Sequence, residues 1–162
     1  MVDAEHNINR LAGEWHVRMN FTMEDGSTAK GTGTATVRSI ALGRGVGLIL
    51  EGDVEGIGSY EEHSTMAYDS ESDQVCMFVV TSLGIVHSHF GRFDGDNCLT
   101  LRWQGTLGGK AAEEEITLSF LSEDEFAIQQ VDRIEGNVAT TGEYAFQRKG
   151  RKVLEGPVPS FA

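Results

Sequence analysis

Apolar and polar residues alternate along this chain with a period of two, and the pattern continues over most of its length. In the first such segment, Trp15 to Met23, every second residue is apolar, and the residues between them are polar or basic. Successive side chains of a β-strand point to opposite faces, so this pattern predicts a strand with one buried and one exposed face. A chain that keeps this period is confined to a β-rich fold.

Short turn sequences interrupt the alternation at regular spacing. Asp94-Gly95-Asp96-Asn97 is typical of a hairpin turn, and we read Gly105 to Gly109 as a longer loop. Before the first strand, Asp3 to Leu11 is compatible with a short helix that Gly13 ends. Between the turns the pattern predicts about ten strands, over residues 15–23, 28–40, 46–54, 59–68, 74–81, 86–93, 98–104, 111–121, 126–134 and 138–148.

These elements predict the fold class. No helical segment separates consecutive strands, so neighbouring strands should run antiparallel. A twisted sheet of this width tends to curl, and closure removes its exposed edges. We therefore predict an all-β, up-and-down antiparallel β-barrel of about ten strands with a short N-terminal helix. One barrel domain would cover residues 1–150, followed by a tail over 151–162.

Charge and hydropathy exclude some classes of partner. The formal net charge is −12, from 25 acidic and 13 basic residues, so the surface should repel the phosphate backbone of nucleic acids. No apolar run reaches the roughly 18 residues of a membrane helix. The first residues, Met1 to His6, carry acid where a secretory signal carries base. We expect a cytoplasmic protein with neither nucleic acid nor membrane as its partner.

One short motif resembles a known class of barrels. Leu11-Ala12-Gly13-Glu14-Trp15 is similar to the opening of calycin-type barrels, where a tryptophan follows a short helix. In those barrels this tryptophan closes one end, often against a basic residue of the last strand. The resemblance implies that Trp15 closes the barrel and that Arg148 is its partner.

The order of further motifs resembles one family more closely. Gly31-Thr32-Gly33 with Arg38 downstream, then Ala67-Tyr68-Asp69, then Phe93-Asp94-Gly95-Asp96 before Leu99-Thr100-Leu101, is similar to the DUF1579 family of unknown function. The resemblance covers most of Leu11 to Arg148 and implies a fold, but no chemistry. Heme-binding nitrobindin-like barrels are more distant, because this chain lacks their later glycines after Trp15. We expect no cofactor.

Two histidines are the sharpest candidates for chemistry. His87 and His89 are two residues apart, so on a strand they share a face with Cα atoms about 6.6 Å apart. They could bind one metal ion with His63 or Glu114 as a third ligand, or move protons near tyrosines. Alternatively, both face solvent and their neighbours face inward. Spacing alone assigns no third ligand, so we predict no metal and leave catalytic residues unassigned.

The predicted function follows from the barrel interior. We expect it to bind a small hydrophobic or amphipathic molecule, because a barrel of this size can enclose one. Two alternatives stay open: a cyclase or isomerase acting on a flexible apolar substrate, and a structural protein with a filled barrel. A homodimer is compatible with each. The candidate ligand-binding residues are Met19, Phe21, Tyr60, Tyr68, His87, His89, Trp103 and Tyr144, and Met66, Met77 and Phe78 could line an apolar cavity beside them.

Overall fold

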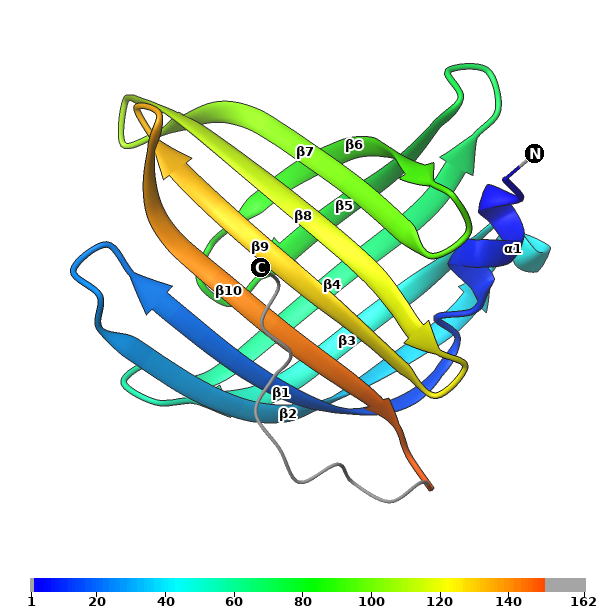
Figure 1. The fold of residues 1–162 in the computed structure, drawn as a ribbon, viewed down its shortest axis with the longest axis horizontal. Helices are drawn as coiled ribbons and strands as arrows, with labels where there is room; N and C mark the ends of the chain where they lie inside the picture. Colours follow the sequence, from blue (N-terminus) through cyan, green and yellow to red (C-terminus); the bar gives the residue numbers. More distant parts are fainter. Residues whose placement is uncertain (1, 151–162) are drawn as a thin grey trace.

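A computed structural model describes residues 2–150 of the chain, and the predicted tail, 151–162, lies outside the described residues. The chain forms a closed ten-stranded barrel in which each strand runs antiparallel to its neighbours (Figure 1). The predicted fold class is confirmed. Its elements are α1 (Ala4–Asn9), β1 (Gly13–Met23), β2 (Thr28–Ile40), η1 (Ala41–Gly43), β3 (Gly45–Val54), β4 (Gly58–Asp69), β5 (Gln74–Thr81), β6 (Val86–Asp94), β7 (Cys98–Leu107), β8 (Lys110–Ser122), β9 (Glu125–Ile134) and β10 (Asn137–Arg148).

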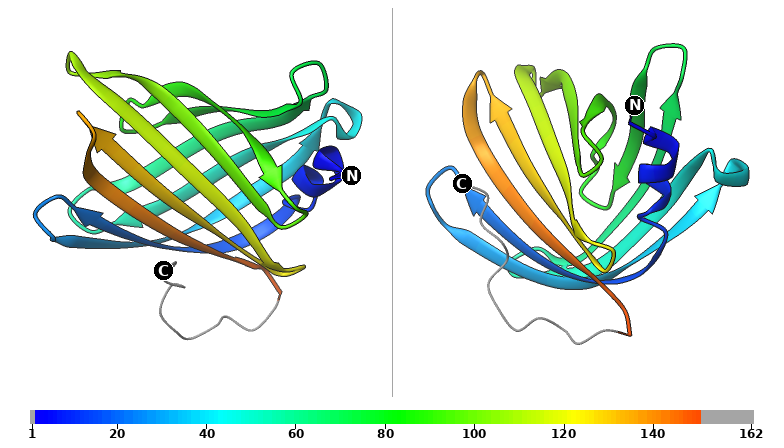
Figure 2. Two further views of the ribbon diagram at one scale, coloured as in Figure 1. Left: turned by 45° about the horizontal axis from the view of Figure 1, so that its top comes forward. Right: turned by 45° about the vertical axis from the view of Figure 1, so that its right-hand side comes forward.

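The barrel closes between its first and last strands. β1 pairs with β10 from Trp15 opposite Arg148 to Met23 opposite Thr140, and consecutive strands make all the other pairs. This pairing leaves neither terminal strand with an open edge. The two views of Figure 2 show the continuous wall that results.

The helix α1 lies across one end of the barrel, against β3 and β4 (Figure 2). The Asp3 carboxylate caps it by accepting the His6 backbone N–H at 2.9 Å. Ile8 and Leu11 are buried at this end. Among the described residues, no helix is both long and apolar enough to span a bilayer.

Trp15 is buried below this helix. Its indole N–H donates to the Leu11 carbonyl at 2.9 Å, and its ring packs edge-to-face with that of Phe126, with the centroids 4.7 Å apart. The Arg148 guanidinium lies 4.2 Å from the Trp15 ring centroid and donates to the Ala12 carbonyl at 2.9 Å. The first and last strands are therefore joined by side chains as well as by their backbones.

The predicted loop over Gly105 to Gly109 is wrong. β7 continues to Leu107, and the turn consists of Gly108 and Gly109, both with positive φ. Gly105 pairs with Ala112 of β8, and the Trp103 ring covers the space where a Cβ would stand. This glycine therefore makes room for a neighbouring side chain inside a strand, and it does not mark a turn.

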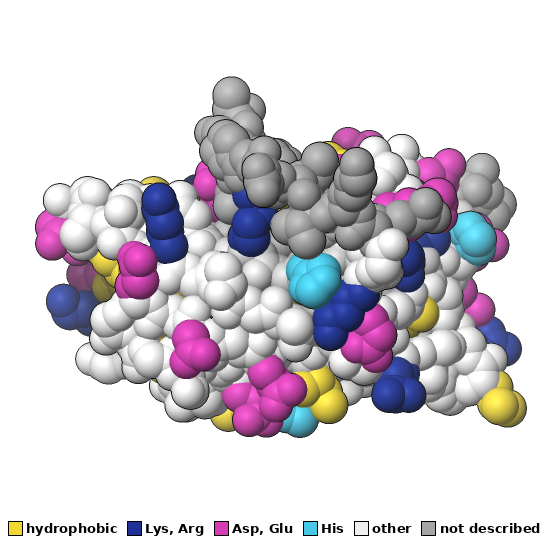
Figure 3. Space-filling model, turned by 90° about the horizontal axis from the view of Figure 1, so that it is seen from below, with side chains coloured by type: hydrophobic (Ala, Val, Ile, Leu, Met, Phe, Trp, Pro, Cys, Tyr) yellow, Lys and Arg dark blue, Asp and Glu magenta, His cyan; other side chains and the backbone are white. Residues whose placement is uncertain are grey.

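Charged side chains cover the outer face of the barrel. Acidic and basic side chains are interspersed over the face shown in Figure 3. Some apolar residues also point outward, among them Phe78, which was a candidate for the cavity and is 48% exposed. Phe78 follows the inward-facing Met77 on β5, so alternation sends it to the opposite face.

Candidate functional site

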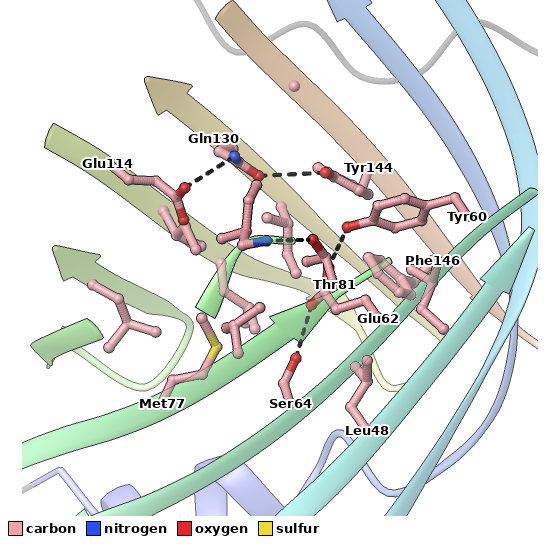
Figure 4. A pocket seen from close by; sticks show the side chains of 18 of the residues that line it. Leu48, Tyr60, Glu62, Ser64, Met77, Thr81, Glu114, Gln130, Tyr144 and Phe146 are labelled. Carbon is pink, nitrogen blue, oxygen red and sulfur yellow. Dashed lines mark hydrogen bonds between the residues drawn. The ribbon is translucent and has the colours of Figure 1, made fainter. Parts of the chain in front are cut away.

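The barrel is hollow. A cavity of about 300 Å³ lies inside it, at the small end of the volumes typical of ligand sites. Its wall is largely apolar, and Met66 is among the lining residues. Figure 4 shows Leu48, Met77 and Phe146 in this wall. The filled-barrel alternative is therefore wrong for this interior.

One part of the wall is polar and centres on Glu62 of β4. Its carboxylate accepts hydrogen bonds from the Tyr60 hydroxyl and the Ser64 hydroxyl, each at 2.8 Å. All three residues are on the inward face of the same strand, because they are two residues apart. Figure 4 shows these bonds converging on the Glu62 carboxylate.

A second polar group comes from β8, β9 and β10. The Gln130 amide donates to Glu114 at 3.3 Å and to Asp132 at 3.2 Å. Its oxygen accepts from the Tyr144 hydroxyl at 3.3 Å. Gln130 therefore links two carboxyl groups to a tyrosine, as Figure 4 shows for Glu114 and Tyr144.

Burial shifts the protonation of these groups. It raises the pKa of Glu62, and together with the nearby Glu114 charge it raises the pKa of Asp132 to about 7. Burial also raises the pKa of Tyr60 and of Tyr144, so both hydroxyls stay protonated donors. The cavity lining contains these three carboxyl groups, of Glu62, Glu114 and Asp132. No Lys or Arg is among its described lining residues.

The two histidines of β6 point into the barrel wall, away from solvent. His89 is fully buried, while Val86 and Phe90 are 57% and 50% exposed on the outer face. The His89 Nε2 lies 2.5 Å from Glu114 Oε1, and the His87 Nε2 lies 3.6 Å from Glu114 Oε2. Of the two residues considered as a third metal ligand, Glu114 therefore lies beside the histidines. His63, the other candidate, is on the outer face with Glu61.

Electrostatics differ between the members of this group. Burial acts to raise the pKa of Glu114, but the hydrogen bond to His89 and the electrostatic attraction of the two neighbouring imidazoles outweigh it, so the net shift is downward. Burial lowers the pKa of His87, against the attraction of Glu114. The arrangement favours an ionised Glu114 beside a neutral His87 imidazole.

The structure brings only some of the predicted ligand-binding residues to the cavity. Phe21, Tyr60 and Tyr144 line it, whereas Met19 is buried in the core beside it. His87 and Trp103 stack at 4.0 Å in the adjoining wall. Tyr68 is elsewhere, in a separate pocket with Arg92, and its hydroxyl donates to Asp73 at 2.9 Å.

Sequence reasoning missed Glu62, Gln130 and Asp132. A signal for them exists, because Glu62 has the same strand parity as Tyr60, and both Gln130 and Asp132 have the same parity as the buried Phe126. Charged and amide side chains are usually assigned to the solvent face of a strand, and here that rule conceals the polar wall.

Solved structures of other proteins share this fold, and two examples come from different organisms. An S-type phycobiliprotein lyase, CPES, from Guillardia theta aligns with a TM-score of 0.66 and 13% identity, over 91% of this chain and 93% of that chain. The protein Rv2717c from M. tuberculosis aligns with a TM-score of 0.63 and 12% identity, over 92% of this chain and 99% of that chain. At such identities the likeness shows the barrel fold alone.

The family is identified at the level of sequence. None of the curated protein sequences matches this chain. The family described as "Protein of unknown function (DUF1579)" matches residues 2–148, which is nearly the whole barrel. The predicted resemblance is confirmed, and the chain belongs to the DUF1579 family.

Proposed function

We propose that the barrel binds one small amphipathic molecule whose polar end donates hydrogen bonds or carries a positive charge. The observation that carries this proposal is the composition of the cavity wall. Carboxyl groups of Glu62, Glu114 and Asp132 face a space that apolar side chains otherwise surround, with no basic residue among the described lining. A bound cation would compensate these acceptors, whereas a carboxylate head group would meet like charge.

The dimensions of the cavity define the rest of the ligand. A volume of about 300 Å³ suits a body of one ring or a short chain, packed against residues such as Leu48 and Met77. Methionine side chains are flexible and polarizable, so this wall can adapt to the shape of an apolar body. The cyclase or isomerase hypothesis would use the same cavity, but binding accounts for its composition without a chemical step.

The test compares three probes that share a body and differ in head group. We expect 4-phenylbutylamine to bind more tightly than 4-phenylbutan-1-ol, and the alcohol more tightly than 4-phenylbutanoate, by isothermal titration calorimetry on EDTA-treated protein. A preference of about tenfold between amine and carboxylate corresponds to about 1.4 kcal/mol. At pH 8, Glu62→Gln should weaken amine binding and leave the alcohol nearly unaffected, because a bound ammonium favours the ionised Glu62 carboxylate and the amide cannot ionise.

A matched pair of variants locates the probe. Met77→Trp places bulk inside the cavity and should abolish binding, whereas Phe78→Trp places it on the outer face of the same strand and should not. Equal affinity of the three probes, or equal effects of the two tryptophan variants, would rule out this site.

We infer as well that the protein acts in the cytoplasm. Cys76 and Cys98 are both free thiols, which is the usual state in a reducing compartment. Location, like the homodimer, stays a prediction.

A further inference from the structure

The inward face of β6 and the facing residue of β8 bring three potential metal ligands together. His87, His89 and Glu114 offer two imidazole nitrogens and a carboxylate oxygen, and these ligand atoms all lie within 4.8 Å of one another. The group is enclosed, since His89 has 0% exposure and the side chains of Glu114 and His87 have 9% and 14%. Burying ionisable side chains is costly unless they are paired with one another or bind a metal ion.

One of the two Nε2 atoms in this group lacks a hydrogen-bond partner among the described residues. Both Nε2 atoms point toward one carboxylate, yet only His89 is close enough to bond to it. The buried Nε2 of His87 has no hydrogen-bond partner among residues 2–150. Its ring is held in place by stacking on Trp103 at 4.0 Å and an interplanar angle of 10°. An unpartnered nitrogen fixed in this direction is suited to donate a lone pair to a cation.

We propose that His87, His89 and Glu114 form a binding site for one divalent transition-metal ion of the zinc class. Two neutral imidazoles and one carboxylate are an established ligand set for Zn²⁺ and related ions, whereas Mg²⁺ and Ca²⁺ prefer oxygen ligands alone. The proposal concerns these residues themselves and does not depend on the amphipathic ligand, although Glu114 also lines the cavity.

The observed distances are compatible with metal binding after a small adjustment. In a tetrahedral site with bonds of about 2.0–2.2 Å, ligand atoms are about 3.3–3.6 Å apart. The His89 Nε2–Glu114 Oε1 separation of 2.5 Å must widen by about 1 Å, and the ligand atoms, which lie up to 4.8 Å apart, must draw together by about the same amount. Both adjustments lie within the reach of side-chain torsions of the two histidines and Glu114.

The surroundings also set the expected affinity. A metal-bound histidine usually donates its second ring N–H to an acceptor, but the buried Nδ1 of His89 has no partner among the described residues. We therefore expect an affinity about 10–100-fold weaker than that of a site with a complete outer shell.

The experiment titrates EDTA-treated full-length protein, free of a histidine tag, with Zn²⁺ against a chromogenic chelator, and in parallel with Co²⁺. We expect one ion per chain, together with the intense visible absorption of low-coordinate Co²⁺. His87→Gln and Glu114→Gln should each weaken Zn²⁺ binding by at least about tenfold. Both substitutions keep a polar side chain, and Glu114→Gln also keeps its length. Near-UV circular dichroism of each variant verifies its fold.

A matched control comes from the outer face of the barrel. His63 lies 2.6 Å from Glu61, so it is also a histidine–carboxylate pair, but it is exposed and belongs to no three-ligand group among the described residues. His63→Gln should leave the affinity and the Co²⁺ spectrum unchanged. Absence of one-to-one binding, or equal losses in His87→Gln and His63→Gln, would overturn the proposal.

Discussion

At the scale of single residues, Glu62 shows how burial sets the protonation of the cavity. Its pKa is raised by burial above the ordinary value of 4.5, so the native state retains a proton that the unfolded state releases. The stability associated with this proton is complete below pH 4.5 and is lost as the pH rises through the native pKa. Above that pH the folded protein carries a buried charge that is only partly compensated by Tyr60 and Ser64.

Glu62→Gln should therefore raise the free energy of unfolding at pH 8 by on the order of 1 kcal/mol, while having little effect near pH 4. The amide keeps the shape of the carboxylate and can still bond to both neighbours. Urea unfolding of wild type and variant at several pH values measures the difference. Glu24→Gln is the control, because that side chain is exposed in the turn between β1 and β2. A difference between wild type and Glu62→Gln that stays constant with pH would contradict the assignment.

Sequence reasoning at this scale succeeded where residue type and strand parity agreed. Tyr60 and Tyr144 were expected in the interior and line it. Glu62 and Asp132 occupy inward-facing positions of their strands, but acidic side chains are usually found on the solvent face. The alternation of apolar and polar residues alone therefore did not assign them to the cavity. The third residue beside His87 and His89 depends on the pairing of β7 with β8, which positions Glu114 opposite Trp103, and no local pattern contains that register.

At the scale of strands, the alternation of apolar and polar residues predicted all ten strands, because every turn between them is short and carries its own sequence signal. The strand ends were less predictable, since a glycine can mark a turn or make room within a strand. Gly52 of β3 is of the second kind. A Cβ on it would stand 3.0 Å from the Gly33 Cα on β2 and 3.1 Å from the Met19 Cε on β1. Small residues here let three strands curve closely around Met19.

Two alanine substitutions in β3 should therefore have opposite effects. Gly52→Ala should destabilise the barrel by about 1–3 kcal/mol, because the added methyl overpacks a site enclosed by backbone. Gly47→Ala has its nearest neighbour at 3.7 Å and should be neutral or stabilising by up to about 1 kcal/mol, because alanine loses less backbone entropy on folding. Thermal and urea unfolding of both variants provide the comparison, and equal losses would refute this account of the curvature.

At the scale of the whole molecule, closure joins segments far apart in the chain. Strand number and the need to protect edges were enough to predict it. The contents of the barrel were not predictable, because an inward-facing apolar residue fits a filled core and a cavity wall equally well. Outward-facing Phe78, Val86 and Phe90 are compatible with the predicted homodimer, which stays a prediction.

The net charge of −12 should make stability depend on salt. Mutual repulsion among the acidic groups opposes the compact state, and Debye screening shortens its range from about 30 Å at 0.01 M to about 8 Å at 0.15 M. Urea unfolding should therefore show a rise in stability over this range of NaCl, with most of the gain below about 0.1 M. Unchanged stability would mean that the acidic groups are too dispersed to repel one another.

Two variants with equal net charge separate this global repulsion from local pairing. Glu51 on β3 is directly opposite Glu61 on β4, whereas Glu115 forms an ion pair with Arg102 at 2.7 Å. Glu51→Lys and Glu115→Lys each change the net charge from −12 to −10, so global repulsion predicts the same reduced salt dependence for both. Local pairing predicts opposite signs at low salt: a gain of about 0.2–1 kcal/mol for Glu51→Lys and a similar loss for Glu115→Lys. If both variants gained stability equally, the charge of the molecule as a whole would outweigh its cross-strand pairs.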